Sequence, residues 1–289
     1  MEFGIRELTH KEFPALTSEM NDPPEKLYIS GNLPDSKSLF LCVVGSRKAT
    51  DYGKEVCRKV INGLSGYAVT VVSGLALGID AEAHRQAIKA GLKTVAVPGS
   101  GLNRDVIYPK SHLSLAREIV NSGGALLSEF EPDFRATAWS FPKRNRIMAG
   151  MSHGVLVIEA QKRSGTLITA RLGLEYNREV LAVPGSIFSS GSEGTNSLIK
   201  DGAHPVTSAE DLVEVFSLAK EKDGGSVAMK GSLSEQERSL MEMLKEPISK
   251  NELIALSKRP VTEVSATITS LEIKGRLTES NGILYPEHK

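Results

Sequence analysis

Residues 40–97 read FLCVVGSRKATDYGKEVCRKVINGLSGYAVTVVSGLALGIDAEAHRQAIKAGLKTVAV, and their pattern determines the fold class. Apolar runs at 40–44, 67–73 and 93–97 alternate here with two stretches, 52–64 and 80–91, in which apolar residues recur with the spacing of a helix. Each apolar run is followed by a turn that contains glycine or proline. Because a helical crossover joins successive strands, we expect them to pair in parallel.

Three further apolar runs extend this pattern along the chain, at 124–128, 154–158 and 179–183. We therefore predict an α/β fold over residues 40–216, with a doubly wound, mainly parallel sheet of an extended Rossmann type. In such a sheet, ligands bind beyond the carboxyl ends of the strands, where the amino ends of helices converge.

The segments on either side of this domain differ from it in composition. Residues 1–39 are acidic and dotted with proline, so we interpret them as a short amino-terminal appendage. Residues 217–231 have the Lys, Asp, Gly and Ser content of a flexible linker. Residues 232–289 show three helical patterns and then Asn281-Gly282, a strong hairpin signal. They predict a separate winged-helix domain.

The overall composition is that of an ordinary globular protein. The 289 residues are 40% hydrophobic and 24% charged, and the formal net charge is zero. Cys42 and Cys57 are too few for a disulfide framework, so we expect reduced core residues. The amino terminus has no apolar secretion signal, and no run approaches the roughly 18 apolar residues of a membrane span. We expect a cytoplasmic protein with no membrane span.

Motifs of several enzyme classes are missing from the sequence. It contains no G-x-x-x-x-G-K-[ST] phosphate loop, no G-x-G-x-x-G after the first strand and no G-x-S-x-G elbow. The six histidines show no metal-ligand spacing, and we interpret His84 as structural. Asp80, Glu129 and Glu159 fall near strand ends, although Asp80 is more simply the N-cap of a helix. We expect no catalytic residue, no metal and no cofactor.

Positive charge is concentrated in one stretch, although the chain as a whole is neutral. Residues 141–178 hold seven Lys and Arg against two Glu. Trp139 lies just upstream of this stretch, Phe141 begins it, and a glycine-hydroxyl turn at 164–166 opens a helix. Basic groups beside aromatic rings and helix amino ends suit phosphates and bases. The stretch therefore predicts a nucleic-acid-binding surface.

Thirteen residues are predicted to bind DNA on this surface and on the first turn of the sheet. Arg47 offers a planar fork of donors to a phosphate, and Phe141 is a platform on which a base stacks. The alternative is that Trp139 and Phe141 are core residues, that the Lys and Arg form a solvated face, and that Asn145 caps a helix. The predicted set is Gly45, Ser46, Arg47, Phe141, Lys143, Arg144, Asn145, Arg146, Lys162, Arg163, Ser164, Gly165 and Thr166.

Eight ordered motifs in the chain resemble those of the DNA-processing protein A family (DprA, also called Smf). They are VVGSR (43–47), SGLALGID (73–80), AVPGSGLNRDVIYP (96–109), LLSEF (126–130), FPKRNRIMAGMSHGVLVIEA (141–160), SGTLITARLGLE (164–175), AVPGS (182–186) and GTNSLIKDGA (194–203). The similarity runs from Pro24 to Phe216.

This resemblance implies a bacterial cytosolic protein, usually a homodimer, that binds single-stranded DNA during natural transformation. The same resemblance implies that it promotes loading of the recombinase RecA and has an extended Rossmann fold without known catalytic activity. In the family, the GSR turn, here Gly45 to Arg47, belongs to the DNA-binding pocket. Two departures are visible: 39 leading residues are too few for the family's sterile-alpha-motif domain, and Asn103 replaces a common aspartate.

Two other functions are consistent with parts of the sequence. The fold and the glycine-rich turns also resemble the lysine-decarboxylase-like nucleotide phosphoribohydrolases, which typically show PGGxGTxxE. Here GTNSL places Leu198 where those enzymes have the acid, which argues against hydrolysis. The other alternative is an adaptor that binds RecA and touches DNA only incidentally.

Overall fold

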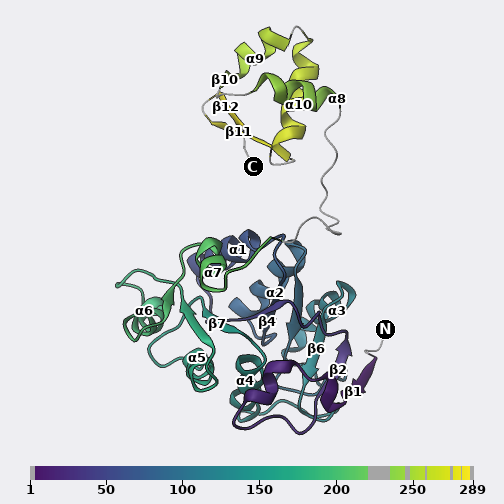
Figure 1. The fold of residues 1–289 in the computed structure, drawn as a ribbon, viewed down its shortest axis with the longest axis vertical. Coiled ribbons are helices and arrows are strands. Elements are labelled where there is room, and N and C mark those ends of the chain that lie inside the picture. The colour runs from purple at the N-terminus through teal and green to yellow at the C-terminus, as the bar shows by residue number, and fades with distance from the viewer. Residues whose placement is uncertain are drawn as a thin grey trace. The chain divides into compact units, whose positions relative to one another are not determined.

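A computed structural model describes residues 4–220, 235–244, 248–257, 259–273, 276–280 and 282–286. The chain divides into two compact units, Met1–Ser226 and Val227–Lys289, each with its own hydrophobic core (Figure 1). Most of the predicted linker, from residue 221 to 231, lies outside the described residues.

A sheet of nine strands forms the centre of the first unit. Neighbours from β6 to β9 pair in parallel, whereas β2 pairs antiparallel with β6 and with β1. The predicted α/β fold with a mainly parallel sheet is confirmed, and all six predicted strands are present. Across the sheet the order is β1 (Ile5–Glu7), β2 (Tyr28–Gly31), β6 (Ala125–Ser128), β5 (Lys93–Ala96), β4 (Val69–Ser73), β3 (Leu39–Val44), β7 (Gly154–Val157), β8 (Glu179–Ala182) and β9 (His204–Pro205).

The amino-terminal residues, interpreted from the sequence as an appendage, extend this sheet. The register of β2 against β6 runs from Tyr28 opposite Ser128 to Gly31 opposite Ala125. Ile29 of β2 is almost completely buried, so this strand is part of the core. Two short 3-10 helices, η1 (His10–Glu12) and η2 (Ala15–Glu19), lie between β1 and β2.

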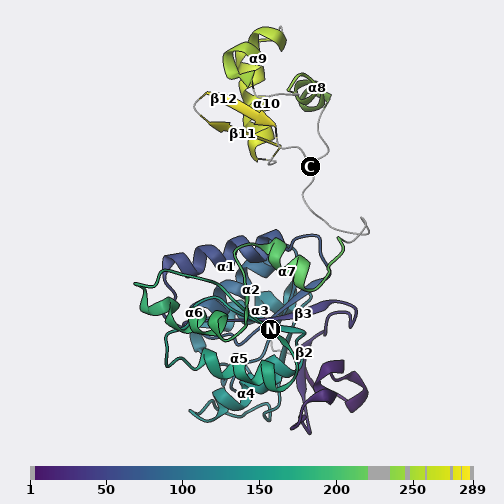
Figure 2. The ribbon, with the colours of Figure 1, turned by 60° about the vertical axis from the view of Figure 1, so that its left-hand side comes forward.

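Helices cover both faces of the sheet, as the alternation of strand side chains requires. Leu41 and Val43 of β3 face one layer, whereas Cys42 and Val44 face the other. Figure 2 shows α1 and α7 on one side of the sheet and α4 and α5 on the opposite side. The first layer holds α1 (Asp51–Gly63), α2 (Ile79–Lys89), α3 (Leu113–Asn121) and α7 (Ala209–Val215), and the second holds α4 (Ser140–Gly150) and α5 (Thr166–Glu175).

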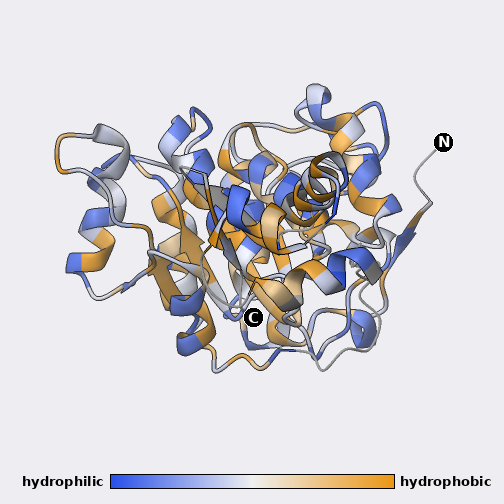
Figure 3. Cartoon of the chain, turned by 90° about the horizontal axis from the view of Figure 1, so that it is seen from above, coloured by the Kyte–Doolittle hydropathy of each residue, from blue (hydrophilic) through white to orange (hydrophobic). Residues whose placement is uncertain are grey.

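The central strands of the sheet, such as β3 and β4, are buried and apolar on both faces, whereas the helices also carry hydrophilic side chains. Figure 3 shows hydrophobic colours along the central strands and mixed hydrophilic and hydrophobic colours along the helices. The remaining elements of the unit are α6 (Glu193–Lys200), beside β8, and the 3-10 helices η3 (Lys110–His112) and η4 (Ser190–Ser192).

The order of the strands reverses at β3. From β3 the chain adds β4, β5 and β6 in one direction, and then α4 carries it back to β7 on the other side of β3. Val44 at the end of β3 therefore lies opposite Val157 at the end of β7. After β3 the chain enters α1 in the first layer, and after β7 it enters α5 in the second layer. Because these two connections separate, a crevice opens here at the edge of the open sheet.

The described residues of the second unit form three helices and a small antiparallel sheet. The helices are α8 (Glu235–Met243), α9 (Lys250–Ser257) and α10 (Val261–Ile273), and the strands are β10 (Ile248–Ser249), β11 (Leu277–Ser280) and β12 (Ile283–Pro286). β11 and β12 pair antiparallel with Ser280 opposite Ile283, as the hairpin signal predicted, and Gly282 has a positive φ of 76°, which suits such a turn. No helix in the described part of the chain is long and apolar enough to cross a membrane.

Both cysteines are buried, unpaired residues of the first unit, as the sequence predicted. Neither has a measurable exposed fraction. Burial raises the pKa of both the Cys42 and the Cys57 thiol, because the thiolate would lose its hydration.

We predict that neither thiol reacts with an aromatic disulfide reagent at pH 8 while the protein is folded. Addition of guanidinium chloride should release about two equivalents of thiol per chain, because unfolding exposes both groups. The absorbance of the released aromatic thiolate measures both phases. Rapid reaction of the native protein would contradict the burial of these residues.

Candidate nucleic-acid interface

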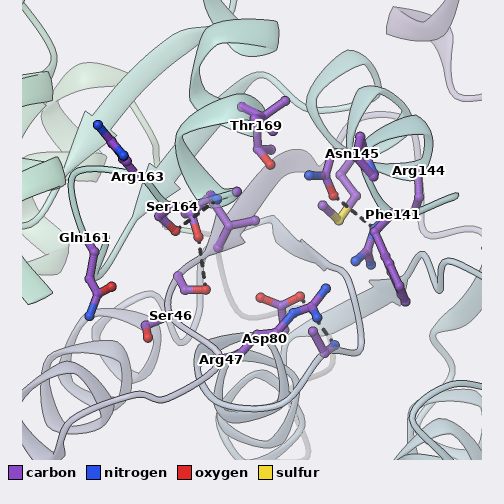
Figure 4. A pocket seen from close by; sticks show the side chains of 18 of the residues that line it. Ser46, Arg47, Asp80, Phe141, Arg144, Asn145, Gln161, Arg163, Ser164 and Thr169 are labelled. Atoms are coloured by element: carbon purple, nitrogen blue, oxygen red, sulfur yellow. Dashed lines mark hydrogen bonds between the residues drawn. The ribbon is translucent and has the colours of Figure 1, made fainter. Parts of the chain in front are cut away.

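A cavity of about 610 Å³ opens at the carboxyl edge of the sheet, where the strand order reverses (Figure 4). The turn after β3 forms one wall, the first turns of α4 form the second, and the turn after β7 with the start of α5 forms the third. Ten of the thirteen predicted DNA-binding residues line it: Gly45, Ser46, Arg47, Phe141, Arg144, Asn145, Arg163, Ser164, Gly165 and Thr166.

Close packing holds the GSR turn in one place. A Cβ atom on Gly45 would lie 2.6 Å from Cγ1 of Ile79, and a Cβ atom on Gly78 would lie 2.2 Å from the carbonyl oxygen of Ser46. Gly78 also has a positive φ of 77°, a conformation that favours glycine. The Ile79 amide donates to the Ser46 carbonyl oxygen over 3.2 Å. The turn therefore presents its next side chain, Arg47, from a rigid base.

Arg47 is exposed and retains its donors for a ligand. Within the part of the chain that the structure describes, its guanidinium makes no hydrogen bond and no ion pair. Its central carbon lies 4.9 Å from the centroid of the Phe141 ring, a cation–π arrangement. A cation and an aromatic ring thus lie side by side at the mouth of the cavity.

Phe141 is half-buried, so it is neither a core residue nor a freely projecting one. One part of its ring rests on Gly99, where a Cβ atom would lie 2.6 Å from Cδ1 of Phe141. The ring of Tyr108, which is itself exposed, lies 5.5 Å away at a tilt of 51°. This support orients Phe141 while part of its surface remains available to a ligand.

The turn before α5 contributes hydroxyl groups and backbone donors. Thr166 donates from Oγ1 to the Gly45 carbonyl oxygen over 3.2 Å, which ties this turn to the first wall. Ser164 accepts from the Thr166 amide at Oγ over 3.2 Å. The amino end of α5 faces the cavity, so its helix dipole favours an anion there. Arg163 is exposed and adds a positive charge.

Arg144 differs from the other basic residues of the cavity, because its side chain is only 4% exposed. Its Nη1 donates to the carbonyl oxygens of Gly74 and Val97, and its Nε donates to Oδ1 of Asn145 over 3.1 Å. These bonds tie Nε and Nη1 of the guanidinium to the protein itself. Arg144 therefore forms part of the floor of the cavity, whereas Arg47 and Arg163 are exposed at its walls.

Asp80 is not the N-cap of α2, in contrast to the sequence interpretation. The N-cap is Gly78, and the Asp80 carboxylate points back to accept from the amides of Gly74 at 3.1 Å and Ala76 at 3.4 Å. Burial raises the pKa of Asp80, while the nearby Arg144 guanidinium and the two amides oppose that rise. Burial also lowers the pKa of Arg144, and Asp80 opposes that change.

Three predicted residues lie outside the cavity. Lys143 and Arg146 project from the other side of α4, where both contact the Glu129 carboxylate, Lys143 at 3.7 Å. Helical geometry explains the difference, since positions 143 and 146 share one side of α4, and positions 141, 144, 145 and 148 share the other. Lys162 is exposed in the turn after β7, but it does not line the cavity.

The other titratable groups near the strand ends have structural contacts. The buried Glu159 carboxylate accepts from the amide and the hydroxyl of Thr50, the N-cap of α1. The buried His84 contacts Oγ1 of Thr94 through Nδ1 at 2.7 Å, and burial lowers its pKa to about 3, so it is neutral. No group of three or more potential metal ligands occurs among the described residues.

Comparison with known proteins identifies the family of this chain. The sequence profile of the family "DNA recombination-mediator protein A" matches residues 5–217. The chain belongs to this family. Protein Smf of Escherichia coli is 46% identical over 202 residues, which cover 70% of this chain but only 54% of that protein. The chain thus spans about half the length of this relative.

Two solved structures of family members share the fold. The structure of DprA from Streptococcus pneumoniae has a TM-score of 0.66 and 39% identity, covering 73% of this chain and 74% of that one. The structure of DprA from Helicobacter pylori, a protein that binds single-stranded DNA, has a TM-score of 0.65 and 29% identity. That match covers 75% of this chain and 98% of the other.

The sequence interpretation missed several residues that line the cavity, among them Lys48, Gln161 and Thr169. Thr169 was detectable, because it lies three positions after Thr166 and so on the same side of α5. Lys48 follows the GSR turn directly, and its exposed side chain adds a further charge to the rim.

We predict that Arg144→Met lowers the free energy of unfolding of the first unit by about 3–5 kcal/mol, because Asp80 and two carbonyl oxygens lose their buried partner. Urea titration followed by the fluorescence of Trp139, the chain's single tryptophan, reports on this unit. Arg163→Met is the matched control, since it removes an exposed guanidinium from the same cavity and should leave the stability nearly unchanged. Equal stability of the two variants would contradict the structural role of Arg144.

Proposed function

We propose that this chain binds single-stranded DNA in the cavity at the carboxyl edge of the sheet. The observation that carries the proposal is the unpaired, exposed Arg47 guanidinium 4.9 Å from the half-buried Phe141 ring. A phosphate fits the guanidinium fork and the amino end of α5, and a base fits the face of an aromatic ring.

The chemistry of the walls favours binding that tolerates any sequence. Backbone N–H groups, hydroxyls and guanidinium groups recognise phosphates, which are the same in every nucleotide. Stacking on Phe141 is equally tolerant, because every base has a π-face. The H. pylori relative is a single-stranded DNA binder with the same fold, which supports the same ligand class here.

The cellular role that we propose is protection of incoming DNA and promotion of RecA loading in natural transformation and recombination. The proposal rests on membership of the family of recombination-mediator proteins. Because the sequence has no motif for nucleotide hydrolysis, the DNA is handed over passively and the chain is not an enzyme. A homodimer in the cytoplasm would carry two DNA sites and bind one strand with avidity.

The domain organisation is part of this proposal. We assign DNA binding to residues 40–216, extended at the edge by residues 1–39, and a winged helix to residues 232–289 after the linker 217–231. Three helices followed by a hairpin, in that order along the chain, favour this assignment for the second unit.

Nucleotide hydrolysis is the less favoured alternative. The side chain of Leu198, where the phosphoribohydrolases have a glutamate, packs against the hydrophobic core beneath α6. The nearby Thr195 hydroxyl is buried and donates to the Ser192 carbonyl oxygen over 3.2 Å. Asp80, the buried acid that lines the cavity, accepts from the Gly74 and Ala76 amides, and the buried Glu159 is engaged at the start of α1. None of these groups is placed for acid–base work.

We predict that Arg47→Ala weakens binding of a fluorescent oligo-dT about ten-fold or more, because a charge-assisted contact to phosphate is lost. The magnitude of the negative slope of the logarithm of the binding constant against the logarithm of the salt concentration should decrease by about 0.7, the contribution of one phosphate on a single strand. Fluorescence anisotropy across a salt series measures both quantities. Arg85→Ala, which removes an exposed arginine of α2 outside the cavity, is the matched control.

Two outcomes would contradict the proposal. If the wild-type chain does not bind oligo-dT at low salt, single-stranded DNA is not its ligand, and nucleotide monophosphates are the next ligands to test. If Arg47→Ala and Arg85→Ala bind as tightly as the wild type, the DNA lies elsewhere on the surface.

A separate prediction distinguishes a DNA-binding mediator from an adaptor that contacts RecA alone. Arg47→Ala should still bind purified RecA in the absence of DNA, but it should accelerate RecA filament formation on single strands much less than the wild type does, because it holds the DNA about ten-fold more weakly. A filament assay by light scattering measures the rate. Full acceleration by a variant that does not bind DNA would support the adaptor.

A further inference from the structure

Trp139 is the single tryptophan of the chain, and it lies at the N-cap of α4 with 55% of its surface exposed. Large aromatic side chains usually bury most of their surface, so this exposure is informative. The predicted DNA-binding set does not include Trp139, and the sequence interpretation placed it in the core only as an alternative. Because more than half of its surface is exposed, Trp139 is not a core residue.

A packed aromatic cluster holds the Trp139 ring from behind. The rings of Phe130 and Phe134 stack with their centroids 4.5 Å apart and an interplanar angle of 17°. Trp139 meets both of them edge-on, with centroid separations of 5.7 Å from Phe130 and 5.5 Å from Phe134. Phe130 is itself only 6% exposed, which anchors the cluster in the protein.

The backbone that carries the cluster is also fixed. The Gly101 amide donates to the Phe134 carbonyl oxygen over 2.9 Å, and the Asn103 amide donates to the Pro132 carbonyl oxygen over 2.9 Å. Next to Trp139, the buried Ser140 hydroxyl donates to the Gly99 carbonyl oxygen over 2.6 Å. An exposed ring on such a base loses little conformational entropy when a ligand stacks on it.

A positive charge accompanies the ring. Nζ of Lys143 lies 5.9 Å from the Trp139 ring centroid and 5.5 Å from that of Phe130. Although the same Nζ is 3.7 Å from Glu129, 47% of the Lys143 side chain stays exposed. An aromatic platform with a reachable ammonium beside it suits a base and its neighbouring phosphate.

The platform is continuous with the cavity. Ala138 and Pro142, which precede and follow Trp139 by one and three positions, line the cavity together with Phe141. Phe141 and Trp139 leave the first turn of α4 in different directions, one into the cavity and one to the Lys143 side. A helix is about 10–12 Å wide with its side chains, so one flexible strand can pass over this turn and reach both rings.

We propose that Trp139, with Lys143 beside it, is a second base-stacking subsite, which takes a nucleotide of the strand that leaves the cavity over the start of α4. This inference rests on the proposed function, because the strand must first occupy the cavity. It also gives Lys143 a contact with DNA, although that residue does not line the cavity. The occupant is single-stranded DNA, since the charge and the continuity with the cavity match a polyanion with aromatic bases.

The fluorescence of Trp139 tests the proposal without any substitution. We expect saturating oligo-dT of about sixteen nucleotides to quench the emission and to protect it from acrylamide, because a stacked base covers the ring. Oligo-dT of about four nucleotides should bind in the cavity and leave the emission largely unchanged. These two lengths bracket the site sizes typical of single-strand binding modules.

Variants of the full chain give an independent measure. Trp139→Leu should weaken binding of the long oligonucleotide about five-fold or more and leave binding of the short one unchanged, whereas Trp139→Phe should retain most of the affinity. The matched control is Tyr67→Leu. Tyr67 also lies beside a lysine, with Nζ of Lys220 at 5.5 Å, but it precedes β4 at the amino edge of the sheet.

Four outcomes would contradict the proposal of a stacking subsite at Trp139. If anisotropy shows saturation by the long oligonucleotide while the emission and its quenching by acrylamide stay constant, the strand does not reach Trp139, and the cavity alone binds DNA. Equal weakening of both lengths by Trp139→Leu would indicate a structural effect on the cavity. Quenching by RecA but not by DNA would assign the ring to a protein partner. If anisotropy shows no DNA binding at all, the proposed function fails first.

Discussion

The buried guanidinium of Arg144 is the contact on which the cavity depends. It joins the carbonyl oxygen of Gly74, which follows β4, to that of Val97, which follows β5, and it does so from α4, an element more than forty residues further along the chain. Three separate segments are thereby held at one point of the sheet edge. A single polar side chain sets the position of the helix that carries both aromatic platforms.

The sequence revealed the architecture because the physical signals for it are local. Apolar runs, helical spacing and glycine turns identified β3 to β8 and the place of the crevice, and the hairpin of the second unit followed from Asn281-Gly282. The pairing of β2 with β6 was not predictable in the same way. It joins residues about a hundred positions apart, and nothing in the segment 28–31 itself specifies its partner.

The roles of the basic residues show where sequence reasoning ends. Arg47, Arg144 and Arg146 are the same residue type in the sequence, but their environments differ. Among the described residues, Arg47 has no hydrogen-bond or ion-pair partner, Arg144 is buried against carbonyl oxygens, and Arg146 is paired with Glu129. The environments of Arg144 and Arg146 are set by the rotation of α4 about its own axis, and that of Arg47 by its place in the turn after β3; all of these are tertiary properties. A count of positive charge therefore included groups that the fold places outside the cavity.

The walls of the cavity come from residues 44–48, 138–148 and 161–169, which are far apart in the sequence. During synthesis the first wall leaves the ribosome more than a hundred residues before the third, so the cavity does not exist until the strand after α4 has paired with β3. The cavity is thus absent from a partly synthesised chain. It forms late, in a chain that already has most of its fold.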